Sequence, residues 1–238
     1  MLFQKRHLTY LVTALFSTFI STAVSAYDAG DMIFRVGPTI VSPNDDSSGV
    51  VGQNTSLGLV SGDDGVTVEE GYALGFTFTY FLDSNFAIEL LAATPFAHDI
   101  EGDGATSGLK VGEVTHLPPT LTLQWHPDEI GEFKPFVGLG INYTIFFDEE
   151  TDAELTSTLD SLLPVSVTST DLELDESIGW AINAGFDYTI APQWNLSAEF
   201  WYIDIETDAT VLVNGAPATD VEVTIDPLVA LIGVSYQF

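Results

Sequence analysis

Residues 71–82 read GYALGFTFTYFL, and the alternation within this stretch decides the fold. The even-numbered side chains are bulky and apolar: Tyr72, Leu74, Phe76, Phe78, Tyr80 and Leu82. The odd-numbered positions from Gly71 to Thr79 hold only glycine, alanine or threonine. Successive side chains of a β-strand point to opposite faces, so this stretch predicts a strand with one bulky apolar face and one small face.

The same period of two recurs along the chain and predicts eight strands. We place them at residues 31–41, 71–82, 86–96, 116–126, 133–147, 177–190, 194–206 and 221–238. The links between them are short at 83–85, 127–132 and 191–193, and longer at 42–70, 97–115, 148–176 and 207–220. No stretch after residue 26 approaches the ~20 apolar residues of a membrane helix. An even strand number with short and long links in alternation is typical of an outer-membrane barrel. The predicted fold is therefore all-β: an eight-stranded antiparallel transmembrane β-barrel with four longer extracellular loops and short periplasmic turns.

A soluble sandwich or lipocalin-like barrel is the alternative, since it also alternates. It would place bulky residues inside and polar residues outside, whereas here the second face is made of small residues that suit a narrow lumen. Aromatic residues also gather at the strand ends, as expected for two girdles at the membrane interfaces. They are Tyr80, Phe86, Trp125, Tyr188 and Phe238 at the short-turn ends, and Tyr72, Phe96, Phe147, Trp180 and Tyr202 near the long-loop ends. The pattern favours the membrane barrel.

The two ends of the chain carry signals of their own. Lys5 and Arg6 precede an uncharged apolar run that ends in small residues at 24–26, which predicts a secretory signal peptide over residues 1–26. The barrel then occupies residues 27–238, in the outer membrane of a Gram-negative cell. The last strand ends on Tyr236 and Phe238. We expect assembly to use this C-terminal aromatic strand.

The charge is very unequal, with 5 basic and 35 acidic residues and a formal net charge of -30. Loss of residues 1–26 leaves Arg35, Lys110 and Lys134 as the only basic residues and gives -32. Nucleic-acid binding is excluded because phosphate contacts need Lys and Arg. The absence of Cys excludes disulfides, thiolate zinc sites and cysteine nucleophiles.

The four long links with their flanking strand ends hold 6, 4, 10 and 5 of the acids, so we expect the charge to lie outside the membrane. Adaptation to a saline habitat is our hypothesis for it.

The links contain two further local signals. Asn214-Gly215 favours a type I′ hairpin, so we expect the last two strands to continue past the membrane as a ribbon. Residues 155–170 are the one apolar segment of a long link, and both a short helix and a lid fit it.

Five motifs resemble those of the outer membrane protein W (OmpW) family. They are LLAATPF (Leu90–Phe96), HLPPT (His116–Thr120), GLGINYTIFF (Gly138–Phe147), WYIDI (Trp201–Ile205) and the terminal YQF. They span the chain after residue 26 in order and with similar spacing. The resemblance implies an eight-stranded outer-membrane barrel with a narrow, largely apolar lumen. It also implies passage of small hydrophobic molecules and a part in envelope or salt stress. The acidic loops depart from the family, which puts loop-borne recognition in doubt.

The odd and even alternation along each strand also predicts which side chains face the lumen. A barrel of eight strands leaves room inside for side chains or for one small ligand. Arg35 is the only inward base, and a charge in a lumen must be paired or hydrated. We expect it to bond at least one of Glu89, Asp187 and Glu199 within a polar plug. The plug is Arg35, Glu89, Gln124, Asp187 and Glu199. Leu91, Ala93, Ala73 and Gly140 are the candidate ligand-binding residues above it. The plug is either purely structural or the floor of a ligand pocket.

Two functions remain open. In the first, a small hydrophobic molecule enters between the long loops, meets Leu91 and leaves sideways into the bilayer. In the second, the lumen is filled and inert, and the acidic loops bind cations, lipopolysaccharide or external partners.

Catalysis and cofactors are not expected. The only histidines after residue 26 are His98, His116 and His126, and no GxSxG or HExxH motif occurs. The acids of 99–103 and 148–154 have calcium-like spacing without a complete twelve-residue loop, so we predict no specific metal site and at most weak divalent binding.

Overall fold

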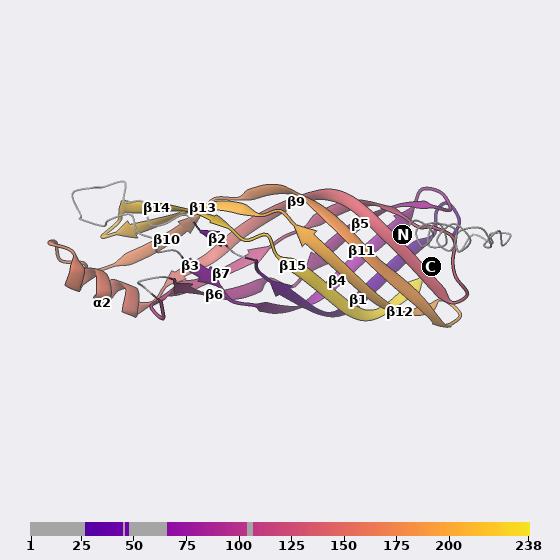
Figure 1. Ribbon diagram of the computed structural model, residues 1–238, viewed down its shortest axis with the longest axis horizontal. Coiled ribbons are helices and arrows are strands. Elements are labelled where there is room, and N and C mark those ends of the chain that lie inside the picture. Colours follow the sequence, from indigo (N-terminus) through magenta and orange to yellow (C-terminus); the bar gives the residue numbers. More distant parts are fainter. Residues whose placement is uncertain (1–26, 45, 48–65, 104–106) are drawn as a thin grey trace, which may run out of the picture.

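The computed structural model describes residues 27–44, 46–47, 66–103 and 107–238 (Figure 1). The predicted signal peptide at 1–26 lies outside the described residues, as does most of the link at 42–70. No helix among the described residues is long and apolar enough to span a membrane.

The wall of the molecule is a closed antiparallel barrel of eight strands, as the alternation predicts. The wall strands are β1 (Met32–Ser42), β4 (Gly71–Phe81), β5 (Phe86–Ala93), β8 (Thr120–Trp125), β9 (Phe133–Thr151), β11 (Ser177–Ala191), β12 (Trp194–Ile203) and β15 (Leu228–Gln237). Each pairs with the next in that order. Pairing of β15 with β1 closes the barrel.

The long links are mostly further strands, which extend the barrel at the end opposite the chain termini (Figure 1). We call this part the loop extension. It consists of β2 (Asp46–Ser47), β3 (Val66–Val68), β6 (Phe96–Gly102), β7 (Lys110–Leu117), β10 (Thr170–Leu174), β13 (Glu206–Val213), β14 (Ala216–Thr224), α2 (Ala153–Leu162) and the last third of β9. In this extension β6 pairs with β7, and β7 with β9.

Both local signals in the links have an outcome here. Asn214 and Gly215 have φ values of 52° and 76° and join β13 to β14, so the predicted ribbon and its turn are confirmed. A short helix and a lid both fitted residues 155–170, and the structure forms a helix over the first part of this segment. Helix α2 begins after Asp152, whose side chain accepts a hydrogen bond from the backbone N–H of Glu154 as an N-cap.

Short breaks separate several wall strands from strands of the loop extension, and one of them overturns a prediction. Residues 94–95 separate β5 from β6, and Pro118 and Pro119 separate β7 from β8. Proline has no N–H to donate to a ladder, so pairing between these two segments stops here, although Thr94 still donates to the Leu74 carbonyl and Pro119 still accepts from Tyr143. After the first break the inward face changes from odd to even numbers, and Phe96 is 1% exposed. Its assignment as an interfacial aromatic is therefore wrong, because it assumed an unbroken strand.

The other predicted interfacial aromatics lie on the outer surface of the barrel or close to it. Tyr72, Tyr80, Phe86, Trp125, Trp180, Tyr188 and Phe238 are exposed, and Phe147 and Tyr202 are partly buried. The outward face between them is a belt of leucine, isoleucine and phenylalanine. A water-facing surface would not carry this belt, whereas lipid tails solvate it.

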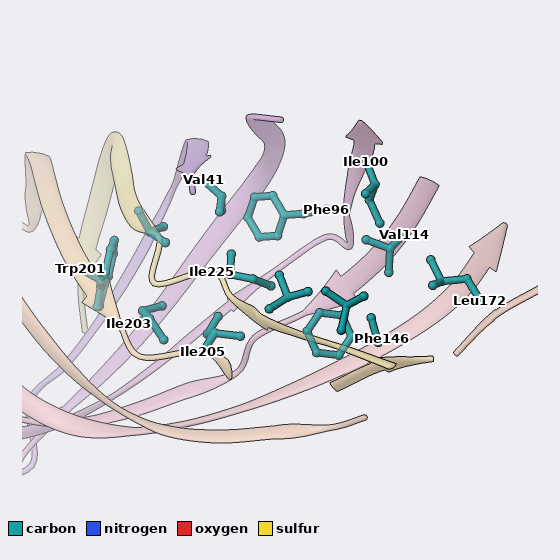
Figure 2. Packing of buried hydrophobic residues seen from close by; sticks show 14 of the residues in the cluster. Val41, Phe96, Ile100, Val114, Phe146, Leu172, Trp201, Ile203, Ile205 and Ile225 are labelled. Atoms are coloured by element: carbon teal, nitrogen blue, oxygen red, sulfur yellow. The ribbon is translucent and has the colours of Figure 1, made fainter. Parts of the chain in front are cut away.

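The apolar core lies inside the tube rather than between layers. The largest of its three clusters of buried residues begins at Trp201 and Leu91 in the lumen and continues into the loop extension. Figure 2 shows the labelled side chains of this cluster in a row from Trp201 to Leu172. We call this row the apolar column. Most of the hydrophobic interior therefore lies in the half of the tube that includes the loop extension.

Candidate functional site

The lower lumen is closed by a network centred on Arg35, which we call the polar floor. Strand β1 directs Arg35 inward, where its side chain is fully buried. Its Nη1 lies 2.8 Å from Glu89 Oε2, and its Nη2 lies 2.7 Å from Asp187 Oδ2. Arg35 Nε also donates to Asp187 Oδ1 at 3.1 Å, so the Asp187 pair is bidentate. The predicted pairing of Arg35 is therefore present, with two of its three candidate partners.

The other predicted members of the plug are joined to this network through Asn183. Its Nδ2 donates to Glu199 Oε1 at 2.6 Å and to Glu89 Oε1 at 3.3 Å. Gln124 Nε2 donates to the same Glu199 oxygen at 3.1 Å. All five predicted plug residues thus lie in one buried cluster. Sequence reasoning did not identify Asn183 as the residue that connects the two glutamates.

An aromatic layer lies beneath the network and seals the short-turn end of the lumen. Tyr27 stacks on Phe81 at 4.0 Å between ring centroids, and His126 lies 4.7 Å from Phe81 and 5.0 Å from Phe136. The Arg35 guanidinium lies 4.8 Å from the Phe136 ring centroid. We did not predict this layer, although Phe81 stands out as the one large residue on the small face of 71–82. Together the network and the rings leave no direct path through the floor.

The lumen directly above the floor is apolar and nearly filled. Leu91 is buried and points inward, and Ala73 and Ala93 pack against the same cluster. A small cavity of about 10 Å³ remains beside Leu91, Ala93 and Phe96. Gly140 does not join this group. A Cβ at Gly140 would lie 2.1 Å from the Leu121 carbonyl oxygen, so its small size allows a close approach of strands in the wall.

The break in the barrel wall lies against this cavity. Pairing between β5 and β8 ends at Leu91 and Thr120, and pairing of β6 with β7 resumes at Phe96 and His116. The cavity is lined both by inward Leu91 and by Ala92 and Pro118 of the interrupted segments. At the level where the lumen is apolar, no ladder pair therefore joins residues 92–95 to residues 117–119.

A larger cavity of about 50 Å³ lies higher, inside the loop extension. Valine and isoleucine side chains of β3, β7, β13 and β14 line most of it, together with Phe146, His98 and His116. The two imidazoles are buried and stack at 4.7 Å with an interplanar angle of 17°. The sequence did not predict that these two histidines meet.

Both histidines lie outside the membrane, since the outward faces of β6 and β7 carry the exposed carboxylates Asp99 and Glu113. Burial lowers the pKa of His98 below its ordinary value, opposed in part by the Glu69 carbonyl and Asp99. Burial and the neighbouring His98 lower the pKa of His116 to about 3. Both imidazoles are therefore neutral near pH 7. A hydrolase would need one of them beside a nucleophile or carboxylate, and no such hydrogen bond occurs in the part of the chain that the structure describes.

The acids of the loop extension lie on its outer surface. Asp99 is the cross-strand partner of Glu113, and Glu113 is the partner of Glu150. These three exposed carboxylates and Lys110 border a polar surface hollow of about 190 Å³. In the described ranges, no group of three or more His, Asp or Glu side chains is arranged to hold a metal ion.

Comparison with known proteins identifies the family. The family model of the OmpW family matches residues 28–238. The chain belongs to the OmpW family. Outer membrane protein W of Vibrio cholerae serotype O1 is 39% identical over 228 residues, which cover 94% of this chain and 96% of that protein. The crystal structure of the outer membrane protein OprG from Pseudomonas aeruginosa has a TM-score of 0.77 and 34% identity, and the match covers 90% of this chain and 99% of that one. A more distant relative, 28% identical over 166 residues, is the dibenzothiophene metabolism operon protein PahQ of Pseudomonas aeruginosa. The match covers 70% of this chain and 71% of PahQ.

Membership in the OmpW family places the chain in the outer membrane, as the barrel pattern of the sequence predicts. The loop extension is then extracellular and the aromatic layer periplasmic, because the long loops of such barrels face outward.

Proposed function

We propose that this OmpW-family barrel binds small hydrophobic molecules and conducts them passively across the outer membrane. One observation carries the proposal: the apolar column runs without interruption from the extracellular cavity to Leu91 and ends on a closed polar floor. Apolar lining attracts a hydrophobic molecule out of water, at about 25 cal/mol per Å² of apolar surface removed. An ion gains nothing there and meets the desolvation cost of the column.

The exit is lateral, since the floor blocks the axial route. Pro95, Pro118 and Pro119 interrupt the wall beside the lower cavity. A hydrophobic molecule at Leu91 therefore reaches the bilayer where no ladder pair joins residues 92–95 to residues 117–119. The name of PahQ, which refers to the metabolism of an apolar aromatic compound, is compatible with such a cargo.

Uptake of a hydrophobic fluorescent probe into liposomes tests the proposal. Leu91→Trp fills the lower column, and we expect it to slow protein-dependent uptake at least fivefold. Leu90→Trp is the matched control, since Leu90 is the adjacent residue and faces lipid at 44% exposure. Uptake by the control should equal that of the wild type. Equal uptake by wild type and Leu91→Trp would contradict transport through the column.

The second candidate is a structural envelope protein whose acidic loops bind divalent cations and, through them, lipopolysaccharide phosphates or external partners. The row of Asp99, Glu113 and Glu150 favours it, because like charges directly opposite each other repel and a cation relieves that repulsion. Calorimetric titration with Ca²⁺ tests it. Loss of a binding signal in the variant Glu113→Gln/Glu150→Gln would support it, and the absence of binding to the wild type would exclude it.

A further inference from the structure

The extracellular cavity is apolar except for two buried nitrogen atoms. Nε2 of His98 and Nε2 of His116 are buried and have no hydrogen-bond partner among the described residues. Both side chains line the cavity, and His98 and His116 are only 2% and 3% exposed. A buried polar atom without a partner is costly, and natural proteins keep few of them. Two such atoms at one cavity indicate a polar group that is supplied from outside the chain.

The tautomer of His98 is fixed by its other nitrogen. His98 Nδ1 lies 2.6 Å from the Glu69 carbonyl oxygen. A carbonyl oxygen only accepts, so Nδ1 carries the proton and donates it. In the neutral ring Nε2 is then a lone-pair acceptor. This edge of the ring packs on Gly71, where a Cβ would lie 2.7 Å from Nε2.

His116 packs among other rings. It stacks on His98 at 4.7 Å and on Phe96 at 5.6 Å. Phe96 also lines the lower cavity beside Leu91. The histidine pair therefore lines the extracellular cavity and contacts Phe96, which also lines the lower cavity.

The chemistry of the site selects the polar group. A hydroxyl both donates and accepts, so it can donate to His98 Nε2 and accept from His116 Nε2 when that nitrogen carries the proton of the neutral ring. A carboxylate suits neither, because it meets two neutral rings inside an extension whose outer face already carries Asp99, Glu113 and Glu150. A plain hydrocarbon leaves both nitrogens unpartnered.

The size of the cavity selects the shape of the ligand. Its volume of about 50 Å³ is roughly one third of the ~150 Å³ cavity that holds benzene in a well-studied engineered protein. A linear alkyl chain enters such a space more readily than a ring does.

We propose that His116 and His98 are the polar recognition element of the column, and that they hydrogen-bond the hydroxyl of a linear alkyl alcohol whose chain lies in the cavity. The inference rests on the proposed function and adds to it the chemical class of the ligand.

The test combines a change in the protein with a change in the ligand. The ligands are 1-hexanol and heptane, which differ by hydroxyl against methyl, and binding is followed by NMR titration of the barrel in lipid nanodiscs. We expect His116→Phe to weaken binding of 1-hexanol about 2–10-fold, the equivalent of one net hydrogen bond, and to leave heptane unchanged. His126→Phe is the matched control, since His126 is another buried histidine at the opposite end of the barrel and should alter neither ligand.

A second measurement does not depend on any variant. Addition of 1-hexanol to the wild type should shift the imidazole ¹⁵N signals of His98 and His116, and heptane should not. Equal binding of both ligands by wild type and His116→Phe, without ¹⁵N shifts, overturns the inference and leaves the hydrophobic conduit standing. Binding of neither ligand overturns the conduit as well.

Discussion

The polar floor and the loop extension enclose the two ends of one tube by opposite means. In the floor, Arg35 and three carboxylates are fully buried, Arg35 pairs with Glu89 and Asp187, and Asn183 links Glu89 to Glu199. In the loop extension the carboxylates lie outside, and the interior is valine, isoleucine and two neutral histidines. Directional bonds hold the floor in a single arrangement, whereas the extension is held by packing that a guest molecule can replace. The difference indicates that closure belongs to the floor and binding to the extension.

Removal of the floor's only cation should have the largest effect. Arg35→Met leaves Glu89, Asp187 and Glu199 buried without compensation, which costs about 3–5 kcal/mol. Urea unfolding of the barrel in nanodiscs measures the loss. Lys134→Met serves as the control, because Lys134 lies at the same end and is only partly buried. A loss for Arg35→Met no larger than that for Lys134→Met would mean that the ion pairs do not hold the floor.

Acid should weaken the extension before the floor. His98 and His116 have pKa values below that of a free imidazole, so the folded state binds fewer protons than the unfolded state. The folding stability that depends on these neutral histidines is fully present above pH 6.5 and is lost as the pH falls toward 3. At pH 5 the cost from His116 is about 2 kcal/mol. Hydrogen exchange in β6 and β7 should therefore accelerate at pH 5, and His116→Phe should suppress the effect. An unchanged acid response in that variant would contradict the assignment.

The tip of the extension depends on one turn. Asn214 has a φ of 52°, and its Oδ1 accepts from the Thr168 N–H at 2.8 Å. Asn214→Ala loses that bond and places an alanine in the left-handed region, at a cost of about 1–2 kcal/mol. We expect proteolysis at β13 and β14 to increase while the thermal stability of the barrel wall is unchanged. Unchanged proteolysis would mean that the ribbon does not depend on this side chain.

Salt should strengthen the extension slightly and leave the floor unaffected. The Debye length falls from about 10 Å at 0.1 M to about 3 Å at 1 M, which screens exposed charges and not buried ones. We expect added NaCl to stabilise the protein by about 1 kcal/mol, and Glu113→Gln/Glu150→Gln to reduce that gain. Equal stability at low and high salt would contradict the hypothesis of a saline habitat.

The sequence predicts the wall and the floor well because both follow from strand parity. Alternation is a local property, and it placed Arg35, Glu89 and Asp187 inward before any contact was known. Parity fails where a strand is broken, which is why Phe96 was assigned to the lipid face. It also does not reveal partners across the tube, so neither the role of Asn183 nor the stacking of His98 on His116 could be predicted. The ribbon of β13 and β14 was predicted from its turn, but β3, β10 and most of β6 and β7 were missed because they lack the lipid-facing apolar side that marks the wall strands.

The central claim is that a hydrophobic molecule occupies the apolar column above a closed polar floor. A crystal structure of the barrel soaked with a brominated alkane tests it most directly, because anomalous scattering locates the bromine. We predict bromine density inside the tube between Val114 and Leu91, with none among Arg35, Glu89 and Glu199. Density confined to the outer apolar belt, with the column still filled by its own side chains, would contradict the claim.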